Sequence, residues 1–263
     1  MDVKSFVLGY TKGKQSGSGG GGDSQLDALI DGTITSLFSN IKKVRSYAFY
    51  NYVDLTDVNF PEATAMGMDA FYGCSKLASA NIPKVTAIPD YAFINCAKLT
   101  TANFPEATLV GQYAFQGCAS LNSVNLPSAT SIQSKAFSGC RGLTKVVFAN
   151  LQTINPTYAF QNCSALISAD FPALTYIGTY TFSGCSALTA LILRNDADVS
   201  LQSTNALSGT PIANGTGYIY RPAARVDTDK AATNWSTYAA QFRALEDYTV
   251  DGTITGELDP NKI

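Results

Sequence analysis

The chain has 263 residues and a formal net charge of −2, and only 14% of its residues are charged. A net charge so close to zero argues against electrostatic steering of nucleic acid or of an anionic membrane surface. The sequence contains no histidine, which excludes a Ser–His–Asp or Cys–His catalytic site and removes the commonest zinc ligand.

The N-terminal part carries two predicted segments. Residues 1–23 comprise a short head and a Gly/Ser tract. The head, residues 1–12, is predicted to be either disordered or a small docking strand, and the tract from Gly13 to Gly22 is predicted to be a flexible linker because it cannot pack. The apolar core of the head, Phe6 to Leu8, is shorter than the roughly 7–15 residues of a signal-peptide core. No apolar run approaches the roughly 18 residues of a membrane span, so this chain is expected to carry neither a signal peptide nor an anchor. Residues 24–41 are predicted to form a degenerate capping coil.

An aromatic motif then recurs along residues 42–194, with a period of 22 residues and one step of 23. Its phenylalanine occupies seven positions: Phe49, Phe71, Phe93, Phe115, Phe137, Phe160 and Phe182. A cysteine follows three residues later in six of the seven units, at Cys74, Cys96, Cys118, Cys140, Cys163 and Cys185. A leucine, an alternating apolar stretch, a proline in most units and a further apolar column complete the unit.

These columns predict a stack of coils. The alternation in L-x-x-V-x-L predicts a short strand with one buried face, and the following proline should end that strand because it cannot donate to a ladder. The A-F-x-x-C segment is expected to form a short helical or 3-10 turn that places Phe and Cys inside. One unit cannot bury its own apolar face, so successive units should stack about 4.8 Å apart and turn each column into a ladder.

The unit A-F-x-x-C-x-x-L-x-x-V-x-F-P-x-x-x-x-x-I, repeated over about Lys42 to Arg194, resembles the BspA-like, or treponemal-type, leucine-rich repeat. With this resemblance, the expected fold is an α/β solenoid. Its 22–23-residue coils wind as a right-handed superhelix, with short parallel strands on a concave wall and short helical or 3-10 turns elsewhere. Such repeats occur in bacterial surface proteins, some of them adhesins, and in phage-like proteins, which implies a location at the cell surface, outside the cell or on a phage particle.

Residues 195–248 are predicted to cap the C-terminal end of the stack. The alternation from Gly217 to Pro222 predicts a strand, and apolar spacing from Asp227 to Leu245 predicts an amphipathic helix. The single tryptophan, Trp235, lies in that helix and is expected to seal the core. Residues 249–263 form a tail that repeats the sequence DGTIT of residues 31–35, which indicates either an edge strand or a coincidence.

Polar side chains lie between the inward residues of each predicted strand and should face outward. The candidate binding face comprises Asp57, Asn59, Ser79, Asn81, Thr101, Asn103, Ser123, Asn125 and Lys145. Ser168 and Asp170 continue the two polar columns, whereas Val147 and Ile192 predict a small apolar patch near their C-terminal end. Two interpretations remain open, because the polar columns indicate either a solvated ladder of stacked amides or the ligand-binding surface that solenoid walls often provide.

Other groups of reactive residues have structural interpretations. All six cysteines share one column, so they should be buried as small apolar side chains, because a linear row suits neither disulfides nor a tetrahedral zinc site. Glycine and asparagine alternate two residues after the phenylalanine, which indicates a left-handed turn and no phosphate loop. Glu62 and Glu106 are two repeats apart, which argues against a catalytic carboxylate pair.

The sequence therefore predicts no catalytic, cofactor-binding or metal-binding residue. The leading hypothesis is a non-catalytic, surface-presenting binding, adhesion or structural protein that recognises a protein or a glycan through the solenoid face. One alternative is a cytoplasmic protein–protein interaction module, and another is an enzyme that uses the C-terminal cap. The chain is expected to be a monomer with no nucleic-acid partner and no membrane insertion.

Overall fold

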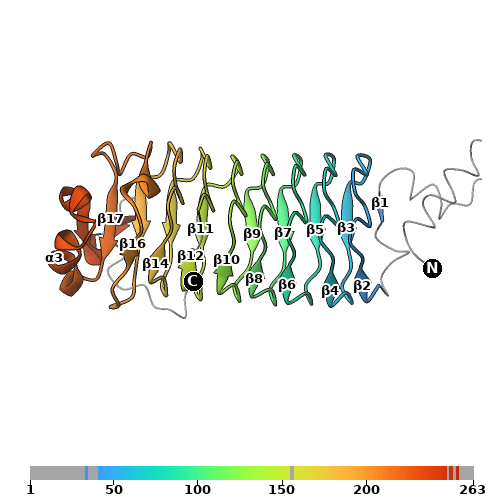
Figure 1. Ribbon diagram of the computed structural model, residues 1–263, viewed down its shortest axis with the longest axis horizontal. Coiled ribbons are helices and arrows are strands. Elements are labelled where there is room, and N and C mark those ends of the chain that lie inside the picture. Colours follow the sequence, from blue (N-terminus) through green and yellow to red (C-terminus); the bar gives the residue numbers. More distant parts are fainter. Residues whose placement is uncertain (1–32, 35–40, 155–156, 248, 251–252, 255–263) are drawn as a thin grey trace, which may run out of the picture.

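The computed structural model describes residues 33–34, 41–154, 157–247, 249–250 and 253–254. Figure 1 shows an elongated stack of coils, with strands β1 and β2 at one end and helix α3 at the other. The coils advance by about 22 residues and carry parallel strands on two walls. This arrangement confirms the predicted solenoid of leucine-rich-repeat type.

The first wall consists mainly of three-residue strands and is called the three-residue wall below. It contains two five-stranded parallel sheets, which follow one another along the stack. The first sheet contains β1 (Thr33–Ile34), β3 (Asp57–Asn59), β5 (Ser79–Asn81), β7 (Thr101–Asn103) and β9 (Ser123–Asn125). The second contains β11 (Lys145–Val147), β13 (Ser168–Asp170), β15 (Ala190–Ile192), β17 (Tyr218–Arg221) and β18 (Phe242–Ala244). These strands confirm the prediction made from the L-x-x-V-x-L alternation.

The opposite wall has two-residue strands and is called the two-residue wall. Strands β2 (Lys43–Val44) and β4 (Ala65–Met66) form one pair. The main sheet contains β6 (Ala87–Ile88), β8 (Leu109–Val110), β10 (Ser131–Ile132), β12 (Thr153–Ile154), β14 (Tyr176–Ile177) and β16 (Ser200–Leu201). Sequence analysis found only the inward apolar column of this wall, because two residues are too few to show an alternation.

The A-F-x-x-C segments form hydrogen-bonded turns that link neighbouring coils. The amides of Phe71 and Gly73 donate to carbonyls of the next coil, each at 2.8 Å. The amide of Cys74 instead donates within its own coil, to the Phe71 carbonyl at 3.2 Å. Because alternate amides leave the coil, the expected helical turns remain single i→i+3 turns and do not extend into helices.

The column two residues after the phenylalanine confirms the predicted left-handed turn. Its residues have φ between 54° and 75°, and they are Asn51, Gly73, Asn95, Gly117, Gly139, Asn162 and Gly184. Stacking adds a reason for the alternation of asparagine and glycine. A Cβ atom on Gly73 would lie 2.1 Å from Oδ1 of Asn51, so the asparagine amide of one coil occupies the space above the glycine of the next.

Phenylalanine rings form the central ladder of the core. Rings of successive coils are stacked with centroids 5.0–5.6 Å apart from Phe49 to Phe182. A second aromatic column, represented by Phe104 and Phe148, packs beside this ladder with centroid distances near 6 Å. The stacking confirms the prediction that the recurring phenylalanines pack in the interior of the stack.

The cysteine column is buried, and its thiols are free. Each thiol donates to the carbonyl of a phenylalanine in the preceding coil, as Cys118 Sγ does to Phe93 at 3.1 Å. Burial raises the pKa of the Cys118 thiol, chiefly through desolvation. The column therefore packs as predicted, with a hydrogen bond that sequence analysis did not foresee.

This burial predicts that the native protein has almost no reactive thiol at pH 8, because a thiol reagent needs an accessible thiolate. Ellman titration of the folded protein should detect little thiol, and the unfolded protein should release the signal of all six cysteines.

Cys118→Ala should lower the free energy of unfolding by about 1–2 kcal/mol, because it removes a buried group. Rapid labelling of several cysteines in the folded protein would contradict this packing.

The C-terminal cap corrects one prediction. Strand β17 confirms the strand expected around residues 217–222, but the expected helix over residues 227–245 is wrong in its bounds. Helix α3 (Ala223–Ala231) ends earlier, and the chain continues through the 3-10 helix η2 (Ser236–Gln241) into strand β18. Ala232 has extended backbone, with φ of −71° and ψ of 153°, which ends the helix, and the Asn234 side-chain amide then donates to the Leu201 carbonyl at 2.8 Å. Contacts between the cap and the last coil therefore end the helix earlier than the apolar spacing of residues 227–245 predicts.

Two further 3-10 helices and one hairpin complete the described elements. They are η1 (Thr204–Leu207), η3 (Leu245–Asp247) and the antiparallel pair β19 (Thr249–Val250) and β20 (Thr253–Ile254). The predicted linker at residues 1–23 lies outside the described residues, as do most of the capping coil at 24–41 and most of the tail at 249–263. Within the described part of the chain, no helix is long and apolar enough to cross a bilayer.

Candidate functional site

The predicted binding face is an ordered polar ladder on β3, β5, β7 and β9. Asn81 Nδ2 donates to Asn59 Oδ1 at 2.7 Å, Asn103 to Asn81 at 2.6 Å, and Asn125 to Asn103 at 2.7 Å. In the neighbouring column, Ser79 Oγ donates to Asp57 Oδ1 at 2.5 Å. Parallel register places these residues directly over one another. The first interpretation of the column, a ladder of stacked amides, therefore describes its geometry.

The ladder leaves hydrogen-bonding capacity at its surface. A primary amide carries two N–H donors and an oxygen with two lone pairs. Each internal asparagine uses one donor and one lone pair within the ladder, so one of each remains. Asn81 and Asn103 are half-buried, Asn125 is exposed, and Thr101 and Ser123 beside them are exposed. The face thus presents fixed amides and hydroxyls without a buried unpaired charge.

The predicted face does not continue evenly to the C-terminal end. Ser168, Asp170 and Ile192, which were expected to face solvent, are buried, with Ile192 only 1% exposed. Val147 remains 36% exposed, so the expected apolar patch of Val147 and Ile192 does not form. Asp170 is held by a two-pronged contact from Arg194, with Nη2 to Oδ2 at 2.6 Å and Nε to Oδ1 at 2.9 Å. Neither the arginine contact nor the burial follows from the repeat pattern.

A break in the sheet sets the C-terminal limit of the polar face. Strands β9 and β11 belong to different sheets, so Lys145, at the start of β11, is not in the ladder of Ser123. The described polar ladder therefore runs from Asp57 to Asn125. This limit removes the only lysine from the continuous face and leaves Asp57 as its one charged member.

The carboxylate of Glu62 is engaged in two ion pairs at the turn after β3. Glu62 lies between Lys84 and Lys42, with carboxylate-to-ammonium distances of 2.7 and 2.9 Å. Hydrogen bonds from Lys84 and Lys42 lower the pKa of Glu62 to about 2. Because this group stays ionised at neutral pH and is solvent-exposed, it is suited to a surface ion pair and not to general acid catalysis.

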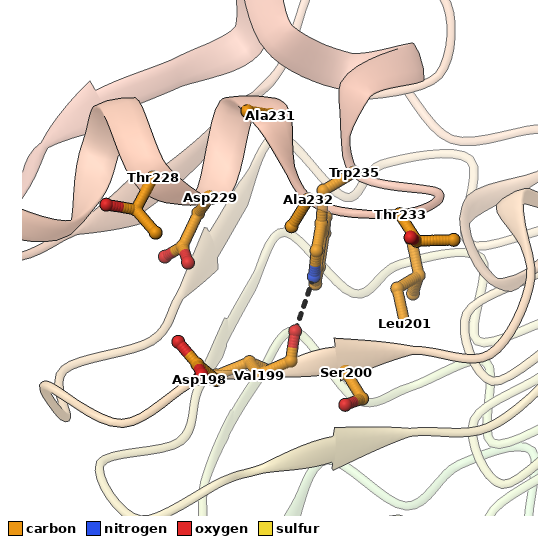
Figure 2. A pocket seen from close by; sticks show the side chains of 10 residues that line it. All are labelled: Asp198, Val199, Ser200, Leu201, Thr228, Asp229, Ala231, Ala232, Thr233 and Trp235. Atoms are coloured by element: carbon orange, nitrogen blue, oxygen red, sulfur yellow. Dashed lines mark hydrogen bonds between the residues drawn. The ribbon is translucent and has the colours of Figure 1, made fainter.

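A pocket of about 420 Å³ separates the last coil from the cap. Figure 2 shows Asp198, Val199 and Ser200 on one side and the end of α3 on the other, with the Trp235 indole between them. Trp235 Nε1 donates to the Val199 carbonyl at 2.6 Å. This contact satisfies a carbonyl at the open edge of the two-residue wall, so the indole joins the cap to the stack as well as sealing the core.

The polar groups of this pocket are largely committed to structure. Asp229 accepts from Arg221 Nε at 2.5 Å and from Arg225 Nη2 at 3.0 Å. Arg225 also pairs with Asp198, at the pocket entrance. Among the described residues, no cluster of three or more histidine, cysteine, aspartate or glutamate side chains could hold a metal ion. The pocket therefore brings together groups that fasten the cap, without a nucleophile and base in contact.

Sequence analysis missed a second outward column, two residues before the phenylalanine. Its members have φ between 55° and 72° and are Tyr47, Asp69, Tyr91, Tyr113, Lys135, Tyr158 and Tyr180. Tyrosine rarely adopts left-handed backbone, so its residue type gave no signal of this conformation. The recurrence of tyrosine at a fixed spacing was the signal available.

The repeat is also found in known proteins. A family model described as the BspA type leucine rich repeat region, in six copies, matches residues 32–128 and 108–216. No curated protein matches the chain. A leucine-rich repeat protein from Bacteroides ovatus is 22% identical, with a TM-score of 0.40, over 69% of this chain and 59% of that chain. This chain thus spans about three fifths of the length of the Bacteroides protein.

Two further solved structures are similar to the chain. The leucine rich repeat protein of T. pallidum is 26% identical, with a TM-score of 0.37, over 56% of this chain and 72% of that chain. A leucine rich cell surface protein from Faecalibacterium prausnitzii is 19% identical, with a TM-score of 0.32, over 78% of this chain and 82% of that chain.

Proposed function

Because this chain belongs to the BspA-type leucine-rich repeat family, we propose that it is a non-catalytic binding protein that recognises an uncharged surface of a partner protein. The proposed contact is the polar ladder of β3, β5, β7 and β9, from Asp57 to Asn125. The observation that carries the proposal is the chain of amide hydrogen bonds along Asn59, Asn81, Asn103 and Asn125.

That chain of hydrogen bonds fixes the side chains before any partner arrives. Immobilising a mobile side chain at an interface costs roughly 0.5–1.5 kcal/mol. The asparagine ladder avoids much of this cost, since neighbouring coils already hold each amide in place. Its remaining donors and acceptors recur once per coil, about 4.8 Å apart. A repeated, fixed pattern of this kind favours an extended protein surface over a small ligand.

The charge of the face favours a neutral partner. Asp57 is the one charged residue among its members, and Ser79 already donates to the Asp57 carboxylate. A partner that brought a charge onto the asparagine ladder would bury it without an opposite charge, which is costly. A basic substitution in the ladder should therefore weaken the complex through both unpaired charge and steric obstruction.

The test compares purified-protein arrays and glycan arrays probed with three forms of the chain. Wild type should bind array proteins, and Asn103→Lys combined with Asn125→Lys should lower that binding at least tenfold. The control, Ala87→Lys combined with Ala119→Lys, adds the same charge at exposed positions outside the ladder and should bind like wild type. Equal binding by all three forms, or binding to glycans alone, would contradict the proposal.

A further inference from the structure

The tyrosine column forms a ladder of half-buried rings in the turns that follow the strands of the two-residue wall. The rings of Tyr91 and Tyr113 are stacked with centroids 5.1 Å apart, and those of Tyr158 and Tyr180 with centroids 4.9 Å apart. Each tyrosine has left-handed backbone, with φ of 58–72° among these four, which disfavours a side chain with a Cβ. Mutual stacking of the rings offsets that local cost.

One rung of this ladder lacks a ring and holds a cation instead. Lys135 lies between Tyr113 and Tyr158, and its Nζ is 5.4 Å from the first ring centroid and 5.3 Å from the second. Both distances lie within the roughly 6 Å over which a cation is attracted to an aromatic face. Lys135 therefore shows that an ammonium group can take the place of a missing ring between two tyrosines of the ladder.

A second rung, called the open rung below, holds neither a ring nor a cation of the described part of the chain. Asp69 occupies the ladder position between Tyr47 and Tyr91, and its short side chain leaves the place of a ring. Tyr91 stacks on Tyr113 on one side, and within the described part of the chain no ring or cation covers its other side. Tyr47 is 44% exposed. Tyr47 and Tyr91 thus flank a position that holds an aspartate in place of a ring, and the Tyr47 hydroxyl contacts Met68 Sδ beside it at 3.9 Å.

The charge at the open rung is opposite to that at Lys135. The Asp90 carboxylate, whose Oδ1 accepts from the Gln112 amide at 2.7 Å, is the nearest like charge that acts on Asp69. Desolvation and this repulsion raise the pKa of Asp69, and a hydrogen bond from Tyr47 opposes the rise. In the described residues, neither carboxylate has a lysine or arginine partner. An arriving cation would relieve the repulsion as well as contact the rings.

We propose that the open rung at Asp69, between Tyr47 and Tyr91, binds a primary alkylammonium group, the lysine side chain of a partner being the natural source. The occupant takes the position that Lys135 takes between Tyr113 and Tyr158. This site belongs to a different column from the asparagine ladder, and its test needs no identified partner. Failure of one proposal therefore leaves the other standing.

The probe is Nα-acetyl-lysine methylamide, titrated into protein with ¹³C-labelled tyrosine and followed by NMR. Saturable shifts are expected at Tyr47 and Tyr91 and not at Tyr176, an aromatic residue on the two-residue wall. The neutral analogue acetylated at the ε-amine should cause no shift. Asp69→Lys supplies the cation from the chain itself and should abolish the shifts, whereas the exposed substitution Lys76→Ala should preserve them.

The decisive variant is Lys135→Asp, which places an aspartate between Tyr113 and Tyr158, as Asp69 lies between Tyr47 and Tyr91, with Thr157 at the position equivalent to Asp90. Aspartate tolerates left-handed backbone, and the urea midpoint of the variant shows whether the coil remains folded. The folded variant should gain a second set of saturable shifts, at Tyr113 and Tyr158. The proposal is overturned if the probe shifts no tyrosine in the wild type, if Asp69→Lys leaves the shifts unchanged, or if folded Lys135→Asp gains none.

Discussion

Replacing Phe115 with alanine should lower the free energy of unfolding by about 3–5 kcal/mol. The Phe115 ring is fully buried and lies between Phe93 and Phe137, with centroids 5.3 and 5.2 Å away. Its removal leaves a cavity in the middle of the stack and interrupts the phenylalanine ladder. Because each coil contacts only its neighbours, the lost contacts cannot be recovered elsewhere. Urea unfolding followed by circular dichroism measures the change.

The position of Phe115 predicts a second signature. A broken coil at the centre of a solenoid should uncouple the two halves, so hydrogen exchange should accelerate in the flanking coils before it does at the ends. Ile167→Ala is the matched control, because Ile167 is 52% exposed and its truncation should change stability by no more than about 0.5 kcal/mol. A loss below 1 kcal/mol for Phe115→Ala would show that the ladder does not stabilise the stack.

Replacing Asp229 with alanine should cost about 3–5 kcal/mol, because it leaves Arg221 buried without its opposite charge. Arg221 is 1% exposed and joins three parts of the chain. It donates to Asp229 on α3, to the Leu193 carbonyl at 3.0 Å and to the Ala197 carbonyl at 2.7 Å. The guanidinium therefore fastens the cap to the loop that leaves the last repeat. Thermal unfolding should show the cap separating first.

Asp198→Ala is the matched control for this ion pair. Asp198 also contacts an arginine, but its side chain is 86% exposed, and an exposed pair contributes no more than about 1 kcal/mol. The double variant Arg221→Met/Asp229→Leu should recover much of the stability lost in Asp229→Ala, since no buried charge remains. Equal losses for Asp229→Ala and Asp198→Ala would show that burial does not decide the effect.

The repeat pattern was sufficient to predict the repeated interior columns and the strands of the three-residue wall, but not the burial of Ser168, Asp170 and Ile192 near its C-terminal end. Phe115 and Cys118 recur in step with their counterparts because each coil must bury the same positions. The pattern also identified the outward asparagine column, and the structure places Asn81 and Asn103 in one hydrogen-bonded ladder. It did not reveal that Asp170 is covered and bound by Arg194, because that arginine follows the strand of the next coil and lies outside the repeated polar columns.

Two elements of the fold could not be predicted from the local sequence: the strands of the two-residue wall and the end of the helix in the cap. The two-residue wall has too few residues per strand to show a period, so Ile88 and Val110 were recognised as members of an apolar column but not as parts of strands. The helix predicted at residues 227–245 had suitable apolar spacing, but Trp235 and Asn234 form hydrogen bonds with carbonyls at the open edge of the last coil. Those contacts exist only after the cap has docked, and they determine where the helix ends.

The sequence by itself determined which repeated columns face inward, because burial acts on every coil alike and leaves the same apolar residue at each equivalent position. It determined the parallel stack for the same reason, since one coil cannot cover its own apolar face. Only the tertiary structure decided what the outward columns do. The stacking of Tyr91 on Tyr113, the cation of Lys135 between two rings and the amide chain of the asparagines join residues about 22 positions apart. Such contacts depend on the distance between coils, and that distance is set by the packed interior.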